Sequence, residues 1–206
     1  MSRGRSFAIA LALGFALAGS ARGEATFVSS RALLARLQPG RRAEVTLRWT
    51  PPSPPGAPVR AVRATLALEP PGRALVGVAA TGEKVTLRPD GGEWLQPAAR
   101  QVVRLAPGHA VVAMRWWTML AAGRGANERR LERRHYRLVL PATPTATADS
   151  ADVWLDAAGL PARLTLDDGL GGRQDWLLSG WRFAHARGEA SFHLHAPPGY
   201  ETFDMP

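Results

Sequence analysis

The sequence predicts a mainly β fold of the α+β class, built on one strongly curved antiparallel sheet with two helices packed against it. Many short segments alternate apolar and polar residues, as half-buried strands do. Turn-forming pairs such as Pro71-Gly72 and Asp90-Gly91 separate these segments. Only residues 29–38 and 109–123 have the apolar spacing of helices. Because the chain has 206 residues and so many strands, the sheet must curl to bury its apolar face.

The N-terminal residues 1–21 have the pattern of a secretory signal peptide. Arg3 and Arg5 precede the uncharged run FAIALALGFALA, and small residues follow it. This run is shorter than the ~20 apolar residues of a membrane-spanning helix, and an uncleaved anchor is the alternative. We expect cleavage between residues 18 and 25, and we expect residues 22–206 to form a single domain.

The first predicted element after the signal is a short helix in SSRALLARLQPGRR, residues 29–42. Ser29 or Ser30 is placed to cap this helix, its three leucines form an apolar stripe, and Pro39-Gly40 ends it.

The predicted strands follow, with one helix inserted among them. They are AEVTLRW (43–49), VRATLALE (62–69), EKVTLRP (83–89), RQVVRL (100–105), YRLVLP (136–141), ADVWLD (151–156), ARLTLDD (162–168), QDWLLSGWRF (174–183) and SFHLHA (191–196). The stretch HAVVAMRWWTMLAAGRG (109–125) has dense apolar residues without strict alternation, which predicts a helix ending at Gly123. Residues 50–58 are expected to be a stiff proline-rich connector, and residues 141–152 a polar loop.

The chain has no cysteine and a formal charge of +9, and Lys84 is its only lysine. Without cysteine it has no disulfide, no thiolate metal site, no thiol nucleophile and no acylated cysteine of a bacterial lipoprotein. Together with the signal peptide, this predicts an exported, soluble, unlipidated protein of the periplasm. The positive charge is typical of proteins that bind anionic surfaces. Export argues against nucleic acid, which leaves acidic partners and anionic lipid head groups.

The order of several strings resembles the LolA family, the periplasmic carriers of outer-membrane lipoproteins. SFHLHAPPGYETF (191–203) resembles the closing strand, Pro-Pro turn and last extended segment of that family. VWLDAAGLPARLTLDDGLGGRQDWLLSGWRF (153–183) is similar to its three successive strands, and LRPDGGEWLQPAARQVVRL (87–105) to its hairpin. The resemblance covers most of residues 29–204.

This resemblance implies an open half-barrel, with helices at about 29–38 and 109–123 covering its concave face. It implies an apolar cavity that takes up acyl chains, with an inner-membrane donor complex and an outer-membrane acceptor as partners. It implies neither catalysis nor a cofactor, and we expect a monomer.

The sequence departs from the family after the strand ATLALE. Family carriers have an Arg-Pro pair there, and its arginine helps to latch the lid over the empty cavity. This chain has Glu69-Pro70-Pro71, with Arg73 shortly beyond. Either Arg73 replaces the latch from a shifted position or the latch is absent.

The expected cavity lining combines aromatic, leucine and methionine side chains. The residues are Leu66, Leu68, Trp94, Met114, Trp117, Met119, Trp154, Trp176, Phe192 and Leu194. Methionine suits such a lining because its unbranched chain adapts to variable ligands. Trp116 and Trp117 cannot both point inward, since adjacent helical residues diverge by ~100°, and one of them is expected at the cavity mouth.

The two histidines near the C-terminus are not expected to bind metal. If residues 191–196 form a strand, Phe192 and Leu194 share one face, and His193 and His195 share the other, which faces water. A structural zinc site needs four ligands, and the remaining histidines have no recognisable ligand spacing.

The basic run RGANERRLERRHYR (124–137) has two interpretations. It forms either a solvated strand edge, where arginine discourages edge pairing, or a docking surface of Arg129, Arg130 and Arg133 for an acidic partner or lipid head groups.

The sequence therefore predicts a periplasmic carrier of lipoprotein acyl chains. The alternatives are a carrier or accessory factor for another lipid or glycolipid in envelope export, and a non-enzymatic envelope sensor or interaction module. Because the chain contains no G-x-S-x-G or H-E-x-x-H motif, an enzyme is disfavoured.

Overall fold

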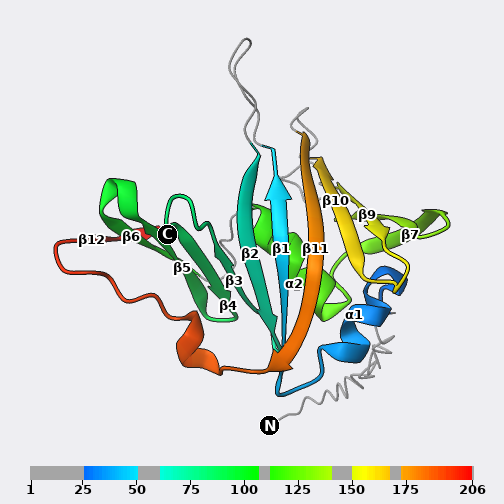
Figure 1. Ribbon diagram of the computed structural model, residues 1–206, viewed down its shortest axis with the longest axis horizontal. Helices are drawn as coiled ribbons and strands as arrows, with labels where there is room; N and C mark the ends of the chain where they lie inside the picture. Colours follow the sequence, from blue (N-terminus) through cyan, green and yellow to red (C-terminus); the bar gives the residue numbers. More distant parts are fainter. Residues whose placement is uncertain (1–25, 51–60, 107–111, 141–149, 168–172, 206) are drawn as a thin grey trace, which may run out of the picture.

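The computed structural model describes residues 26–50, 61–106, 112–140, 150–167 and 173–205. Within them, twelve strands form one sheet (Figure 1). The strands are β1 (Arg41–Trp49), β2 (Val62–Glu69), β3 (Arg73–Gly77), β4 (Lys84–Arg88), β5 (Gly91–Gln96), β6 (Gln101–Leu105), β7 (Asn127–Glu132), β8 (His135–Val139), β9 (Ser150–Leu155), β10 (Pro161–Asp167), β11 (Arg173–His185) and β12 (Glu201–Met205). The helices are α1 (Arg31–Arg36) and α2 (Val112–Ala122), with 3₁₀ turns η1 (Val28–Ser30), η2 (Pro97–Ala99) and η3 (Glu189–Phe192).

The sheet is open in the part of the chain that the structure describes. Its strand order is β12-β6-β5-β4-β3-β2-β1-β11-β10-β9-β8-β7, so β12 and β7 are the two edges. The expected antiparallel pairing is confirmed for every neighbouring pair except β12 and β6, which run parallel. The segment between β11 and β12, here called the C-terminal crossover, carries the chain from the middle of the sheet to the edge beside β6, where β12 runs parallel to it.

One face of the sheet is apolar across most of its width. Residues directly opposite in adjacent strands share a face, and two such rows define what we call the inner face. One row is Val45, Leu66, Val76, Val85, Trp94 and Val103. The other is Trp49, Trp176, Leu164, Val153 and Tyr136. The opposite face, here the outer face, carries the alternate residues, among them Arg42, Glu44, Glu69 and Glu93.

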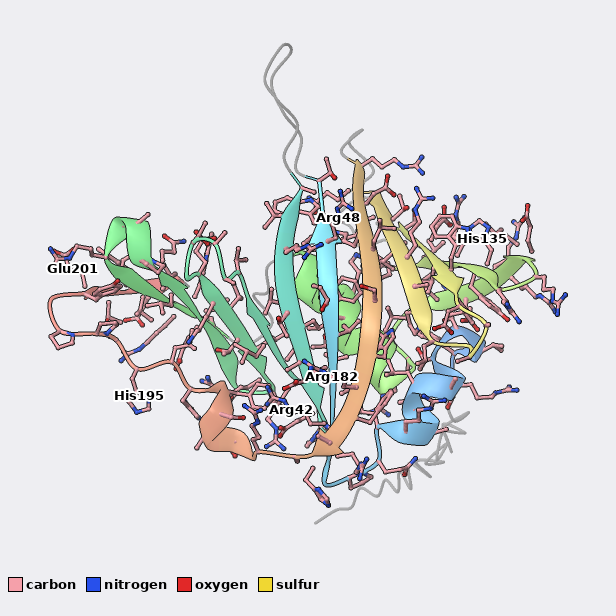
Figure 2. All side chains as sticks on the ribbon, in the orientation of Figure 1. Arg42, Arg48, His135, Arg182, His195 and Glu201 are labelled. Carbon is pink, nitrogen blue, oxygen red and sulfur yellow. The ribbon has the colours of Figure 1, made fainter. Side chains whose placement is uncertain are left out.

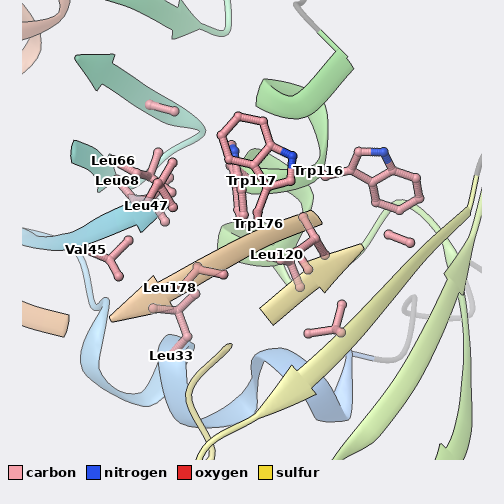
Figure 3. Close-up of a cluster of buried hydrophobic side chains, with 14 of the residues drawn as sticks. Leu33, Val45, Leu47, Leu66, Leu68, Trp116, Trp117, Leu120, Trp176 and Leu178 are labelled. Atoms are coloured by element: carbon pink, nitrogen blue, oxygen red, sulfur yellow. The ribbon is translucent and has the colours of Figure 1, made fainter. Parts of the chain in front are cut away.

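The hydrophobic core lies on the inner face, where both helices pack. Figure 1 shows α2 behind β1, β2 and β11, and α1 beside the lower end of the sheet. Leu33 of α1 and Leu120 of α2 join Leu47 and Leu66 of the sheet in one buried cluster (Figure 3). Each such side chain contributes roughly 1.5–3 kcal/mol by burial, so the inner face and the helices stabilise one another.

The expectation that only one of Trp116 and Trp117 is enclosed is wrong. Both side chains are 1% exposed. Figure 3 shows their rings leaving α2 in different directions, as adjacent helical residues must. Both directions end in the core, because α2 has buried neighbours on more than one of its sides.

The two predicted helices are confirmed over their described residues, with a different cap on the first. Residues 109–111 lie outside the described residues, and α2 ends before Gly123, whose φ of +68° suits glycine. Neither Ser29 nor Ser30 caps α1 through its hydroxyl. The carboxylate of Glu128 instead accepts the N–H groups of Val28 at 2.7 Å and Ser29 at 2.9 Å.

Eight of the nine predicted strands are confirmed, and the strand at 191–196 is wrong. Gly188 has a φ of +81°, which turns the chain out of β11, and residues 189–192 form η3. The hydroxyl of Ser191 donates to the Gly188 carbonyl at 2.8 Å, and Arg88 donates to the Phe192 carbonyl at 2.9 Å. These bonds use backbone groups that a strand ladder would need. Strands β3, β5, β7 and β12 are not among the nine predicted strands, and β9 begins at Ser150, inside the expected polar loop.

The predicted signal peptide and most of the proline-rich connector at 50–58 lie outside the described residues. Among the helices that the structure describes, none combines the length and the hydropathy needed to cross a bilayer.

Candidate functional site

Six of the ten expected lining residues lie on the inner side of the molecule. Leu66, Leu68, Trp117 and Trp176 are buried in the core cluster, and Met119 packs against it. Trp94 is half-buried and shares its cross-strand row with Val85 and Val103. The side chain of Met114 lies outside the described residues. The inner face between β5 and β11, together with α2, is therefore the candidate site.

Trp154 lies on the other face of β9. Its neighbours Ala151 and Val153 belong to the core cluster, and successive residues of a strand point to opposite faces. The Trp154 ring stacks on His135 with centroids 4.2 Å apart, and the Arg163 guanidinium lies 4.8 Å from the ring centre. The structure thus separates Trp154 from the inner set.

Phe192 and Leu194 also lie apart from the inner set. Phe192 is fully buried, but its ring lies beneath the guanidinium groups of Arg42 and Arg73, at 5.7 and 5.8 Å, and outside the core cluster. Leu194 is half-buried, and its N–H donates to the Glu93 carboxylate. Phe192 therefore packs on outer-face side chains, and the backbone of Leu194 is bound by one.

A buried ion-pair network on the outer face fixes this C-terminal segment. The side chain of Glu69 is 0% exposed and accepts from the guanidinium of Arg42 at 3.2 Å. It also accepts the backbone N–H groups of Arg187 at 2.8 Å and Gly188 at 3.3 Å. Figure 2 shows Arg42 and Arg182 near the lower ends of β1 and β11. The network ties β1 and β2 to the chain that follows β11.

Arg73, the candidate latch residue, takes part in the same network. Its guanidinium donates to the Pro70 carbonyl at 2.8 Å and lies 3.8 Å from the Glu69 carboxylate. These contacts place Arg73 against its own turn and the C-terminal segment. Its role as a latch stays a prediction.

Three tryptophans form a contact chain on the inner face. Trp49 and Trp176 are cross-strand neighbours whose rings stack with centroids 5.1 Å apart, and Trp117 of α2 meets Trp176 edge to face at 6.0 Å. The indole nitrogens of all three are buried without a hydrogen-bond partner among the described residues. A buried donor without an acceptor costs about 1–3 kcal/mol. Three such donors in one cluster are therefore unusual for a folded protein.

Trp49 was not among the residues expected to line the cavity, although the alternation of apolar residues in its strand indicates its position on the inner face. It ends the alternation of Val45 and Leu47 in β1, which puts all three on one face.

A cleft opens at the rim of the core, beside the helices. Its volume is about 450 Å³, and it lies between Leu37, Ala121 and Ala122 on the helix side and the turns at Pro70–Gly72 and Pro89 on the sheet side. The core behind it is packed, with side chains such as Leu66 and Trp117 almost completely buried.

The basic residues of the candidate docking surface lie at one edge of the sheet. Arg129 and Arg130 are exposed on β7, and Arg133 is exposed in the turn that follows. His193 and His195 are also exposed, and His193 lies 3.6 Å from Glu93. In the described ranges, no group of three or more histidine, aspartate or glutamate side chains could hold a metal ion.

No protein-family model matches the chain, and no curated protein matches it. Among solved structures, an uncharacterized conserved protein from Thermus thermophilus is 15% identical, with 86% of this chain and 99% of that chain covered and a TM-score of 0.48. A LolA superfamily protein from Nitrosomonas europaea is 13% identical, with 82% and 98% covered and a TM-score of 0.45. A domain from Vibrio parahaemolyticus that is named for outer-membrane lipoprotein sorting is 13% identical, with 80% and 94% covered and a TM-score of 0.47.

The described residues themselves form a mainly β fold with one large open sheet and few helices.

Proposed function

We propose that this protein is a periplasmic carrier that binds the acyl chains of lipoproteins against the inner face of its sheet and passes them toward the outer membrane. The observation that carries the proposal is the continuous apolar inner face, which α1 and α2 meet through apolar side chains such as Leu33, Trp117 and Leu120. Acyl chains can replace these side chains on the sheet because the side chains of the buried cluster are apolar. Burial of each CH₂ group contributes about 0.8 kcal/mol.

In this proposal α1 and α2 cover the concave face of a half-barrel and act as its lid. The cleft beside Ala121 and Ala122 is where the lid begins to part from the turn at Pro70–Gly72. Binding needs no covalent chemistry and no cofactor. Release requires an acceptor or a conformational change that favours the empty state, because tight burial alone makes a trap.

The same proposal includes the processing and partners implied by the sequence. The signal peptide is removed, and residues 22–206 act as a single unlipidated domain and as a monomer. An inner-membrane donor complex loads the carrier, and an outer-membrane acceptor unloads it. The exposed residues Arg129, Arg130 and Arg133 dock an acidic partner or anionic lipid head groups at the β7 edge. Their reversal to glutamate should weaken binding to anionic vesicles or to the donor, and unchanged binding would remove this role.

A second candidate function is the carriage of another lipid or glycolipid. It is favoured by Glu69, which stands where the family has its latch arginine. Its carboxylate is engaged by Arg42 and two backbone N–H groups on the outer face. A carrier that lacks the family latch controls its lid differently, and its cargo can differ too.

Native mass spectrometry of the protein purified from the periplasm tests the carriage of lipid. We expect added masses that correspond to lipoprotein or lipid, and we expect the delipidated protein to bind a fluorescent C16 fatty acid. A protein that carries no lipid after purification and also does not bind the fluorescent fatty acid would contradict the proposal. The identity of the added mass separates the two cargo classes.

A matched pair of variants locates the binding face. Val76 and Leu75 are adjacent and both half-buried, but Val76 packs on the core, whereas Leu75 pairs with Thr86 and Ala67 on the outer face. Val76→Ser should weaken probe binding severalfold because it places a hydroxyl on the inner face. Leu75→Ser should leave binding unchanged.

A further inference from the structure

We infer that the interior binds cargo through a carbonyl as well as through its acyl chains, with the indole N–H groups of Trp49, Trp117 and Trp176 as donors. The chemical class is a neutral ester- or amide-linked lipid, whose linkage is buried together with the start of the chain. This inference rests on the proposed function and specifies its cargo.

The donors come from three separate elements that meet on the inner face. Trp49 ends β1, Trp176 lies opposite it on β11, and Trp117 reaches them from α2. The side chains of Trp117 and Trp176 are 1% and 8% exposed, and all three indole nitrogens are buried without a partner in the described part of the chain. A cargo that lies between α2 and the sheet would therefore contact this cluster.

The chemistry of these groups specifies an acceptor. An indole N–H only donates, and the surrounding core consists of apolar side chains. A bare hydrocarbon would leave the donors unsatisfied. An ester or amide carbonyl can accept these hydrogen bonds through its two lone pairs. It is also the first polar group next to the hydrocarbon part of an acyl chain.

Charge decides between a carbonyl and an anionic group. A carboxylate or phosphate buried without a cation would be strongly disfavoured. The buried charged residues Arg42 and Glu69 lie on the outer face and pair with one another. The inner cluster therefore suits a neutral acceptor.

A fourth tryptophan provides an internal control. Trp181 packs against the same core, but its indole N–H donates to the Pro161 carbonyl at 2.8 Å. Among the described residues, the backbone thus satisfies the indole of Trp181, while the indoles of Trp49, Trp117 and Trp176 have no acceptor. Replacement of tryptophan by phenylalanine removes the N–H donor and keeps most of the apolar ring, both at Trp181 and at the three tryptophans without a partner.

Competition with a bound fluorescent C16 fatty acid tests the inference on the delipidated full chain. The competitors are methyl palmitate and heptadecane, which have similar length but differ in the carbonyl. We expect Trp117→Phe and Trp176→Phe each to weaken methyl palmitate binding by about fivefold to tenfold, the value of one hydrogen bond, and to leave heptadecane binding unchanged. Trp181→Phe should lower the melting temperature and leave the ratio of the two affinities unchanged.

The outcomes separate this inference from the proposed function. If the chain binds neither competitor nor the fatty acid, lipid carriage itself fails. If it binds both competitors and the phenylalanine variants keep the same affinity ratio, carriage stands and the indole role is overturned, with water as the partner of these donors. Should a variant not fold, the infrared band of carbonyl-labelled methyl palmitate on the wild-type protein decides. A band shifted downward by hydrogen bonding supports the inference, and a band like that in alkane solvent overturns it.

Discussion

The carboxylate of Glu69 on β2 lies 3.2 Å from the guanidinium of Arg42 on β1, and their side chains are 0% and 5% exposed. The same carboxylate accepts two backbone N–H groups of the segment after β11. A buried acid at this position thus joins two central strands to the C-terminal crossover.

Replacement of Glu69 by glutamine should therefore destabilise the protein strongly. The variant removes the fully buried counter-charge of Arg42, whose Nε keeps the less buried carboxylate of Glu44 at 2.8 Å. The loss should therefore approach, without exceeding, the roughly 3–5 kcal/mol that breaking a buried ion pair costs. Urea unfolding measures the change. Asp90→Asn is the control, because Asp90 pairs with Arg88 through a side chain that is 67% exposed and should cost at most about 1 kcal/mol. Equal losses in the two variants would contradict the role of burial.

Asp152 should make stability depend on acid pH. The two hydrogen-bonding nitrogens of Arg137 lie 2.8 Å from its two carboxylate oxygens, and this interaction holds the pKa of Asp152 below its ordinary value of 3.8. Because the folded pKa is lowered, the stabilisation is present above the unfolded pKa and is lost as the pH falls through the folded pKa.

Arg137→Ala tests this linkage. The variant should be less stable than the wild type at pH 7, and the difference should shrink as the pH falls below 3.8. Urea unfolding across this range measures the difference, and carboxyl NMR follows the titration of Asp152. Arg137→Lys should recover only part of the effect, because lysine lacks the two-pronged geometry. A deficit of equal size at pH 7 and pH 3 would refute the assignment.

Phe192→Ala should loosen the C-terminal crossover and spare the inner face. Phe192 is fully buried beneath Arg42 and Arg73 and is separate from the core cluster. Loss of a buried phenylalanine costs about 3–5 kcal/mol, and hydrogen exchange should rise first at the amides of Arg187 and Gly188. The folded fraction should bind the fluorescent fatty acid with wild-type affinity. If the fully folded variant binds the fatty acid more weakly than the wild type, Phe192 is part of the lipid-binding lining after all.

The sequence predicted the inner face well because its signal is local. Alternation in β1 and β2 placed Leu66 and Leu68 correctly, and the dense apolar run before Gly123 located α2. These features depend on residues a few positions apart, which periodicity detects.

The errors arose where distant partners decide the structure. SFHLHA alternates as a strand does, but Arg88 and Glu93 bind its backbone from about a hundred residues away. The expected lining included Trp154, whereas the register of β9 placed its ring against His135 on the outer face. The cap of the first helix comes from Glu128, which no local motif signals.

Glu128 should also control how easily the first helix leaves the sheet. Its two carboxylate oxygens accept the N–H groups of Val28 and Ser29 at 2.7 and 2.9 Å, and so attach η1 and α1 to β7. Glu128→Ala removes both acceptors and Glu128→Gln removes one, so hydrogen exchange at these two amides should increase in that order. If α1 belongs to a lid, uptake of the fluorescent fatty acid should accelerate in the same order. Glu132→Ala is the control, since Glu132 is exposed on the same strand and should change neither rate. Faster exchange without faster uptake would mean that α1 is fixed in place and that α2 alone opens the interior.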